Sequence, residues 1–169
     1  MLPAAPVPGA RTDEVPHLEP LSEPSILRVD AALVARAAPL FDAYRRFYGQ
    51  ASDLAAAERF LAERVARDES AIFLACDGAL GAGFMQLYPA FTSVGLARIW
   101  ILNDLFVAPE ARGRGIARTL LETARRHARA TGARRVDLAT AVTNARAQAV
   151  YEKFGFERNE GFRQYSLRV

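Results

Sequence analysis

Two glycines in the middle of the chain, Gly113 and Gly115, stand between an apolar stretch and an amphipathic one. Residues 98–107 before them are nearly all apolar, which is typical of a strand covered on both faces. From Ile116 onward, apolar residues recur at helical spacing and predict a helix. A helix start offers unpaired backbone N–H groups and partial positive charge, and glycines let a ligand approach closely. With arginines flanking it, this stretch predicts a phosphate site.

The same stretch also fits an ordinary strand-to-helix connection in which the glycines serve only the turn. Two other phosphate-binding loops are excluded by residue type. No Lys-Ser or Lys-Thr pair follows the second glycine, so this is not a Walker A loop. The three-glycine fingerprint of dinucleotide-binding proteins is also missing from the sequence.

Two blocks of the sequence resemble the signatures of one enzyme superfamily. Residues 112–117, Arg-Gly-Arg-Gly-Ile-Ala, are similar to the Arg/Gln-x-x-Gly-x-Gly/Ala motif of the GNAT superfamily of acyl-CoA-dependent N-acetyltransferases. Residues 144–156 are similar to that family's Asn-x-x-Ala-x-x-x-Tyr-x-x-x-Gly-Phe block. The blocks occur in the family's order. Residues 86–91 and 102–107 look most like the branch with the yeast histone and polyamine acetyltransferases, whose members tend to dimerise, which implies a homodimer.

The resemblance implies transfer of an acetyl group from acetyl-CoA to a primary amine of a small molecule, polyamine or peptide, by direct attack in a ternary complex. It implies the family fold, an α/β layered domain with a mixed, mostly antiparallel sheet, a splayed central strand pair and flanking helices. The cofactor-binding residues that it implies are Leu105, Phe106, Val107, Arg112, Gly113, Arg114, Gly115, Ile116, Ala117 and Asn144. The alternative is a non-catalytic CoA-binding regulatory module of the same fold.

Tyr151 matches the tyrosine of the second block and is the expected catalytic acid. A phenol and an alkyl thiol have similar reference acidities, so a phenol can protonate a departing thiolate without a large penalty. Another interpretation is structural, because residues 147, 150, 151 and 154 form a helical core stripe. Asn144 likewise has a local role open to it, that of a helix N-cap.

The group that accepts the amine proton is harder to identify. An aliphatic amine is mostly protonated at neutral pH, so a base or a water chain must take its proton. Polyamine and thialysine acetyltransferases of the family often carry a glutamate where this chain has Asn103, and an amide is no general base. We expect Asn103 to orient a water or the substrate.

Because side chains alternate along a strand, Asp104 is expected on the face opposite Asn103. There it fits either a structural role in the strand or a charge at an interface. The other candidate groups on the substrate side are aromatic or amide residues, each of which also fits a core or interface role. They are Tyr44, Tyr48, Gln86, Tyr88 and Trp100.

The composition limits the remaining classes of function. The 169 residues fit one domain, and 51% hydrophobic residues are ample for a core. Cys76 is the sole cysteine, so no internal disulfide forms, and a cytoplasmic location is expected. No metal site, secretory signal or membrane span is expected. A nucleic-acid module remains a further alternative, through Arg112, Arg114, Arg118, Arg125, Arg126 and Arg129, although such arginines are usually solvated.

Residues 1–24 hold six of the nine prolines and are expected to form a flexible tail before one domain at 25–169. The expected strands are 26–29, 71–76, 83–88, 98–107 and 136–141, with further strands after residue 156. The expected helices are 31–48, one capped by Ser52, one beginning near 116, and one capped by Thr143 or Asn144 and ending at Gly155.

Overall fold

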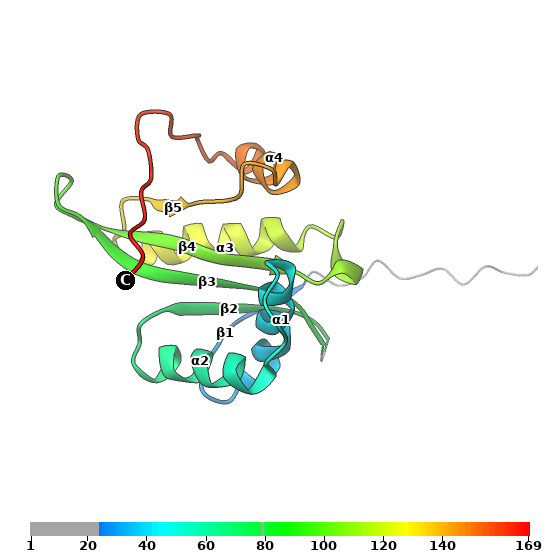
Figure 1. Ribbon diagram of the computed structural model, residues 1–169. Coiled ribbons are helices and arrows are strands. Elements are labelled where there is room, and N and C mark those ends of the chain that lie inside the picture. The colour runs from blue at the N-terminus through cyan, green and yellow to red at the C-terminus, as the bar shows by residue number, and fades with distance from the viewer. Residues whose placement is uncertain (1–23, 79) are drawn as a thin grey trace, which may run out of the picture.

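A five-stranded sheet forms the centre of the computed structural model, which describes residues 24–78 and 80–169. The strands follow chain order across the sheet (Figure 1). They are β1 (Ser25–Arg28), β2 (Ala71–Asp77), β3 (Leu80–Thr92), β4 (Ala97–Val107) and β5 (Val136–Leu138). The first four pair antiparallel, and β5 runs parallel to β4. The expected mixed, mostly antiparallel sheet is confirmed, whereas the expected tail at 1–24 lies almost entirely outside the described residues.

Helices cover both faces of this sheet. They are α1 (Val34–Phe47), α2 (Leu54–Ala66), α3 (Ile116–Ala130) and α4 (Ala145–Phe154). On one face, Phe41 of α1 packs edge-on against Phe84, with ring centroids 5.8 Å apart. On the other face, His127 of α3 packs against Phe73 at 5.3 Å. The sheet therefore separates α1 and α2 from α3, and α4 lies beside α3 (Figure 1).

A β-bulge interrupts the pairing of the two longest strands. Asp104 stands opposite Gln86, but Leu102 stands opposite Leu87, so Asn103 has no partner of its own on β3. A bulge breaks the alternation of side chains between the two faces of a sheet. Beyond it, Phe106 packs toward Tyr44 of α1, whereas before it Trp100 packs against His127 of α3. Even-numbered residues of β4 thus change faces at Asn103.

The splayed central strand pair is also confirmed. Residues 100–102 of β4 pair with 136–138 of β5, and among the described residues no strand pairs with 103–107 on that side. Backbone N–H and C=O groups require hydrogen-bond partners. The second half of β4 therefore presents an open strand edge.

Three expectations about local structure are wrong. Asp53, not Ser52, caps α2, accepting from the Ala56 N–H at 2.9 Å, while the Ser52 hydroxyl donates to Asp42 at 2.6 Å. The expected strand at 136–141 ends at Leu138. Residues 156–169 form no strand and pair with none of the five strands of the sheet.

Candidate active site

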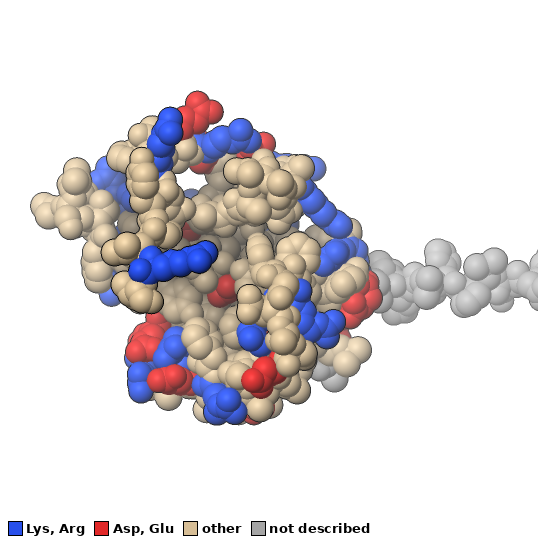
Figure 2. All heavy atoms as spheres, viewed as in Figure 1, with Lys and Arg blue, Asp and Glu red and all other residues tan. Residues whose placement is uncertain are grey.

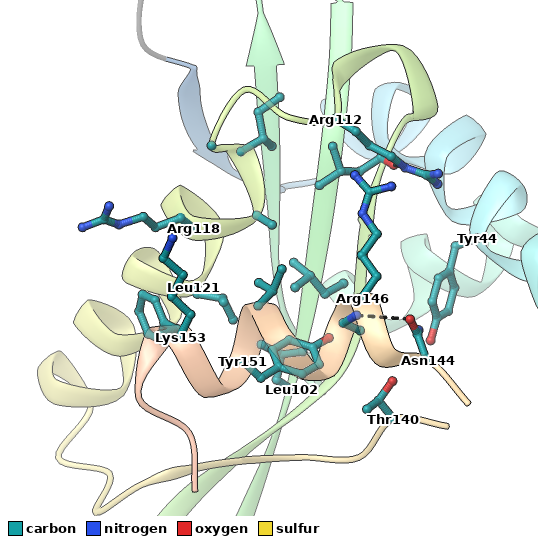
Figure 3. A pocket seen from close by; sticks show the side chains of 18 of the residues that line it. Tyr44, Leu102, Arg112, Arg118, Leu121, Thr140, Asn144, Arg146, Tyr151 and Lys153 are labelled. Atoms are coloured by element: carbon teal, nitrogen blue, oxygen red, sulfur yellow. Dashed lines mark hydrogen bonds between the residues drawn. The ribbon is translucent and has the colours of Figure 1, made fainter. Parts of the chain in front are cut away.

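A cleft of about 820 Å³ opens between the second half of β4, the start of α3, and the facing sides of α1 and α4 (Figure 3). The residues expected for cofactor binding or catalysis meet along it. Those that line it are Asn103, Leu105, Val107, Arg112, Gly113, Gly115, Ile116, Ala117, Asn144 and Tyr151. The two sequence blocks at 112–117 and 144–156, which are separated by about thirty residues, therefore line one cavity.

One end of the cleft is the start of α3. Gly113 and Gly115 both have left-handed backbone conformations, with φ of +81° and +79°, and Gly115 is the N-cap. No atom lies within 4 Å of a Cβ built on either glycine, so the turn is open to an incoming group. The Arg112 side chain folds back, its Nε donating to the Val107 carbonyl at 3.1 Å. Free N–H groups at a helix start next to a guanidinium form an anion site.

Two residues of the expected cofactor set direct their side chains elsewhere. Arg114 forms an ion pair with Asp77 at 2.8 Å, at the end of β2. Phe106 is buried against Tyr44 on the α1 face. Only the backbones of these two residues remain available to a ligand in the cleft.

Tyr151 lies on the wall formed by α4. Its ring packs edge-on against Phe156, with centroids 5.8 Å apart, and it lines the cleft as well. Burial, followed by the nearby Tyr48, raises its pKa to about 12. The phenol therefore keeps its proton at neutral pH. Because Tyr151 both packs against Phe156 and lines the cleft, its position is compatible with the catalytic interpretation and with the core interpretation.

The bulge brings Asn103 and Asp104 together. Asn103 donates from Nδ2 to the Asp104 carboxylate at 3.2 Å, so their side chains meet rather than lying on opposite faces as alternation predicted. The Tyr44 hydroxyl donates to the Asn103 carbonyl at 3.4 Å and also reaches the Asp104 carboxylate. Asp104 is only 5% exposed, and burial raises its pKa, against the lowering effect of both hydrogen bonds.

Asn144 has the expected capping role, since its side chain accepts from the Ala147 N–H at 3.2 Å at the start of α4. Its position also lines the cleft. Sequence reasoning missed the neighbours Arg146 and Lys153, which line the cleft from the same helix (Figure 3). The available signal was their spacing, because residues 146, 150 and 153 follow one helical face.

The other candidate substrate residues are placed differently. Tyr44 of α1 and Tyr48, the C-cap of that helix, line the cleft opposite α4. Gln86 is fully buried, its Nε2 donating to the Ser70 hydroxyl at 2.8 Å, and Tyr88 does not line the cleft. Trp100 is buried beneath α3, where its Nε1 donates to the Thr131 hydroxyl at 2.8 Å.

Two of the four arginines of α3 are engaged by neighbouring side chains. Arg125 pairs with Glu122 and lies over the Phe154 ring, and Arg126 donates to the Thr123 hydroxyl at 3.0 Å. Figure 2 shows basic and acidic side chains interspersed over the visible face. Within residues 24–78 and 80–169, no helix is long and apolar enough to cross a membrane, and no group of three or more His, Cys, Asp or Glu side chains could hold a metal ion.

Comparison with known proteins gives a consistent result. The model of the acetyltransferase (GNAT) family matches residues 37–156. The chain is 47% identical to the N-acetyltransferase YhfO of Bacillus subtilis, over 83% of this chain and 92% of that protein. It is 33% identical to a probable acetyltransferase of Haemophilus influenzae, over 78% of this chain and 88% of that protein.

Solved structures resemble the fold closely. A crystal structure of a probable acetyltransferase is 42% identical and superposes with a TM-score of 0.81, covering 86% of this chain and 97% of that one. The aminoglycoside N-acetyltransferase AAC(6')-Iy, solved in complex with CoA, superposes with a TM-score of 0.75 at 21% identity, covering 90% of this chain and 99% of that one. At that identity, the second likeness concerns the fold alone.

Proposed function

Because this chain belongs to the acetyltransferase (GNAT) family, we propose that it transfers the acetyl group of acetyl-CoA to a primary amine while both molecules are bound. One observation carries the proposal. A helix start suited to phosphate, an open strand edge and a protonated tyrosine share a single cleft. The helix start suits the phosphates of acetyl-CoA, and the open strand edge suits the amide groups of its pantetheine arm. The protonated tyrosine suits the thiol, which must be protonated as it leaves.

The residues of the cleft fit acetyl-CoA. The backbone N–H groups from Gly113 to Ala117 would hold the pyrophosphate, since no side chain obstructs the turn. Residues 103–107 of β4 would pair with the amide groups of the pantetheine arm, which need partners when they are desolvated. Arg118, in the first turn of α3, and Lys153 of α4 lie close to each other in Figure 3 and supply compensating charge. The aminoglycoside enzyme of the same fold was solved in complex with CoA, which supports this assignment.

Acetyl-CoA supplies the acetyl group as a thioester. Tyr151 is the proposed acid of the chain, holding its proton on the phenolic oxygen until a thiolate accepts it. A pKa near 12 keeps the donor fully protonated at neutral pH. The contact with Phe156 fixes the ring, so the hydroxyl is oriented before the reaction.

Asn103 and Asp104 are the proposed acceptor-side groups. Asn103 lines the cleft and orients the incoming amine or a water beside it. The Asp104 carboxylate, held behind it by Asn103 and Tyr44, attracts the amine's proton. A raised pKa makes this carboxylate a better proton acceptor than an exposed aspartate.

Thiol release from acetyl-CoA, measured with a panel of primary amines, tests the proposal. Calorimetry with acetyl-CoA alone is measured in parallel. We expect micromolar binding and turnover with at least one class of amine. Binding without turnover by any small amine or lysine peptide would favour the regulatory module, and absence of binding would remove acetyl-CoA altogether.

We also propose a homodimer in the cytoplasm. Large apolar side chains are exposed in the connection between β3 and β4 and in the C-terminal segment, namely Val94, Leu96, Tyr165, Leu167 and Val169. Such surfaces are commonly covered by a second protein. Sedimentation velocity should give twice the monomer mass, and a monomer at all concentrations would contradict the dimer.

A further inference from the structure

The acceptor end of the cleft has a distinct composition. It is formed on one side by Tyr44 and Phe47 of α1 with the C-cap residue Tyr48, and on the other side by the bulge of β4. Tyr44 and Tyr48 meet edge-on with centroids 5.0 Å apart, and Phe47 and Tyr48 at 5.2 Å. Phe47 is 59% exposed and Tyr48 50%, although both belong to the cleft lining. We call these three residues the aromatic wall.

The aromatic wall is held in place from below. Tyr44 packs against Phe41 and Phe84 of the core, with centroid distances of 6.5 and 5.8 Å. Buried Asp42 fixes the turn that follows the aromatic wall, accepting from the Ser52 hydroxyl at 2.6 Å and the Asp53 N–H at 2.9 Å. The aromatic wall is therefore a preorganised surface rather than a set of loose side chains.

The charges around the cleft are mostly positive. The basic lining residues are Arg112, Arg118, Arg125, Arg146 and Lys153. The acidic lining residue is Glu122, and it pairs with Arg125. Figure 3 shows Arg112 and Arg146 extending between the start of α3 and Tyr44. A second ammonium group on an acceptor would meet these guanidinium groups rather than a carboxylate.

From this geometry, and resting on the proposed function, we infer that the acceptor is a monoamine whose amino group is attached to an apolar, aromatic body. Its amine meets Asn103, with the buried Asp104 carboxylate held behind that amide, and its body lies on the aromatic wall. A single carboxylate behind the bulge favours a single ammonium group, and aromatic side chains supply contact area at low entropic cost. Polyamines and aminoglycosides, which carry several ammonium groups, are disfavoured.

The test compares phenethylamine with spermidine and kanamycin, by thiol release at saturating acetyl-CoA. We expect kcat/KM for phenethylamine to exceed that for either polycation by roughly ten-fold or more. A preference for spermidine or kanamycin would overturn the inference and leave the proposed function standing. No turnover with any of the three, in protein that binds acetyl-CoA, would count against the proposed function and the inference together.

Substitutions in and outside the aromatic wall test whether that surface binds the acceptor. Tyr48→Ala should raise KM for phenethylamine by roughly ten-fold and leave KM for acetyl-CoA unchanged. Phe91→Ala is the matched control, because Phe91 is 70% exposed on β3 and lies outside the cleft lining. An unchanged KM for phenethylamine in Tyr48→Ala, with melting as in the wild type, would overturn the role of the aromatic wall.

Discussion

At the scale of single residues, Tyr151 combines packing and chemistry in one ring. Its packing with Val150 and Phe154 against the hydrophobic core accounts for the apolar stripe in the sequence, and its place in the cleft accounts for the family motif. The two interpretations could not be separated in the sequence because both require the same helical face. Only the position of α4 across the cleft from β4 shows that this face also borders a cavity.

Replacing Tyr151 by phenylalanine keeps the ring and removes the proton donor. We expect kcat to fall by about 100-fold, within the range typical of general acid catalysis. The affinity for acetyl-CoA, measured by calorimetry, should not change. Tyr165→Phe, at an exposed tyrosine outside the cleft lining, is the control and should behave as the wild type. Full activity in Tyr151→Phe would remove this residue from the chemistry.

Asp104 illustrates a conflict between stability and activity. Burial raises the pKa of its carboxyl in the folded state above the unfolded value. The folded protein is therefore favoured by this group at pH values below the unfolded pKa, and that contribution is lost as the pH rises through the folded pKa. At neutral pH the buried charge destabilises the fold.

Asp104→Asn should accordingly raise Tm at pH 7 and lower kcat/KM for the amine. The gain in Tm should shrink in acid, where the wild-type carboxyl is itself neutral. Thermal melts from acid to neutral pH, paired with rate measurements, check both effects. A lower Tm at neutral pH would mean that the carboxylate is well compensated by Asn103 and Tyr44.

At the scale of elements, the two ends of α3 offer a matched experiment. Gly115 at its start and Gly132 after its end have φ of +79° and +68°, and a Cβ at either meets nothing within 4 Å. A glutamate at either site costs about 1–2 kcal/mol of backbone strain. Only Gly115→Glu also places a negative charge at the phosphate end.

We therefore expect a lower Tm in both variants, with the larger loss in Gly132→Glu because its charge lies at the negative end of the helix dipole, and loss of acetyl-CoA binding in Gly115→Glu alone. Differential scanning fluorimetry with and without acetyl-CoA measures both quantities together. Retained stabilisation by acetyl-CoA in Gly115→Glu would show that the start of α3 does not hold the phosphates.

Most of the elements were predictable because they depend on local patterns. The apolar periodicity predicted α1 and α3, and the caps at Asn144 and Gly155 are side-chain and backbone signals read within one turn. The bulge at Asn103 was not predictable. Trp100, Leu102 and Phe106 are apolar and buried on both sides of it, so the alternation of apolar residues gives no sign that the strand changes faces. The C-terminal residues alternate like a strand, but pairing depends on a neighbouring strand that the sequence does not specify.

At the scale of the whole molecule, the positions of the basic side chains matter more for binding an anionic ligand than the net charge of +3. Several line the cleft, whereas Arg114 and Arg126 are engaged outside its lining. An anionic ligand in a basic cleft is attracted electrostatically, and salt screens that attraction. The Kd for acetyl-CoA should rise roughly ten-fold between about 50 and about 500 mM NaCl.

Calorimetry at several salt concentrations checks this dependence. A duplex DNA probe in the same buffers provides the comparison, because the nucleic-acid alternative requires a steep salt dependence for DNA. DNA binding that acetyl-CoA does not displace would revive that alternative.

The bulge of β4 also determines where compensating changes should occur during evolution. Trp100 contacts His127 of α3 and Thr131, the C-cap of that helix, whereas Phe106, six residues later, contacts Tyr44 of α1. Substitutions near the start of the strand should therefore covary with α3, and those after Asn103 with α1. Because of this single inserted residue, the contacts between β4 and α1, beside the acceptor, can diversify while the contacts between β4 and α3 stay constant.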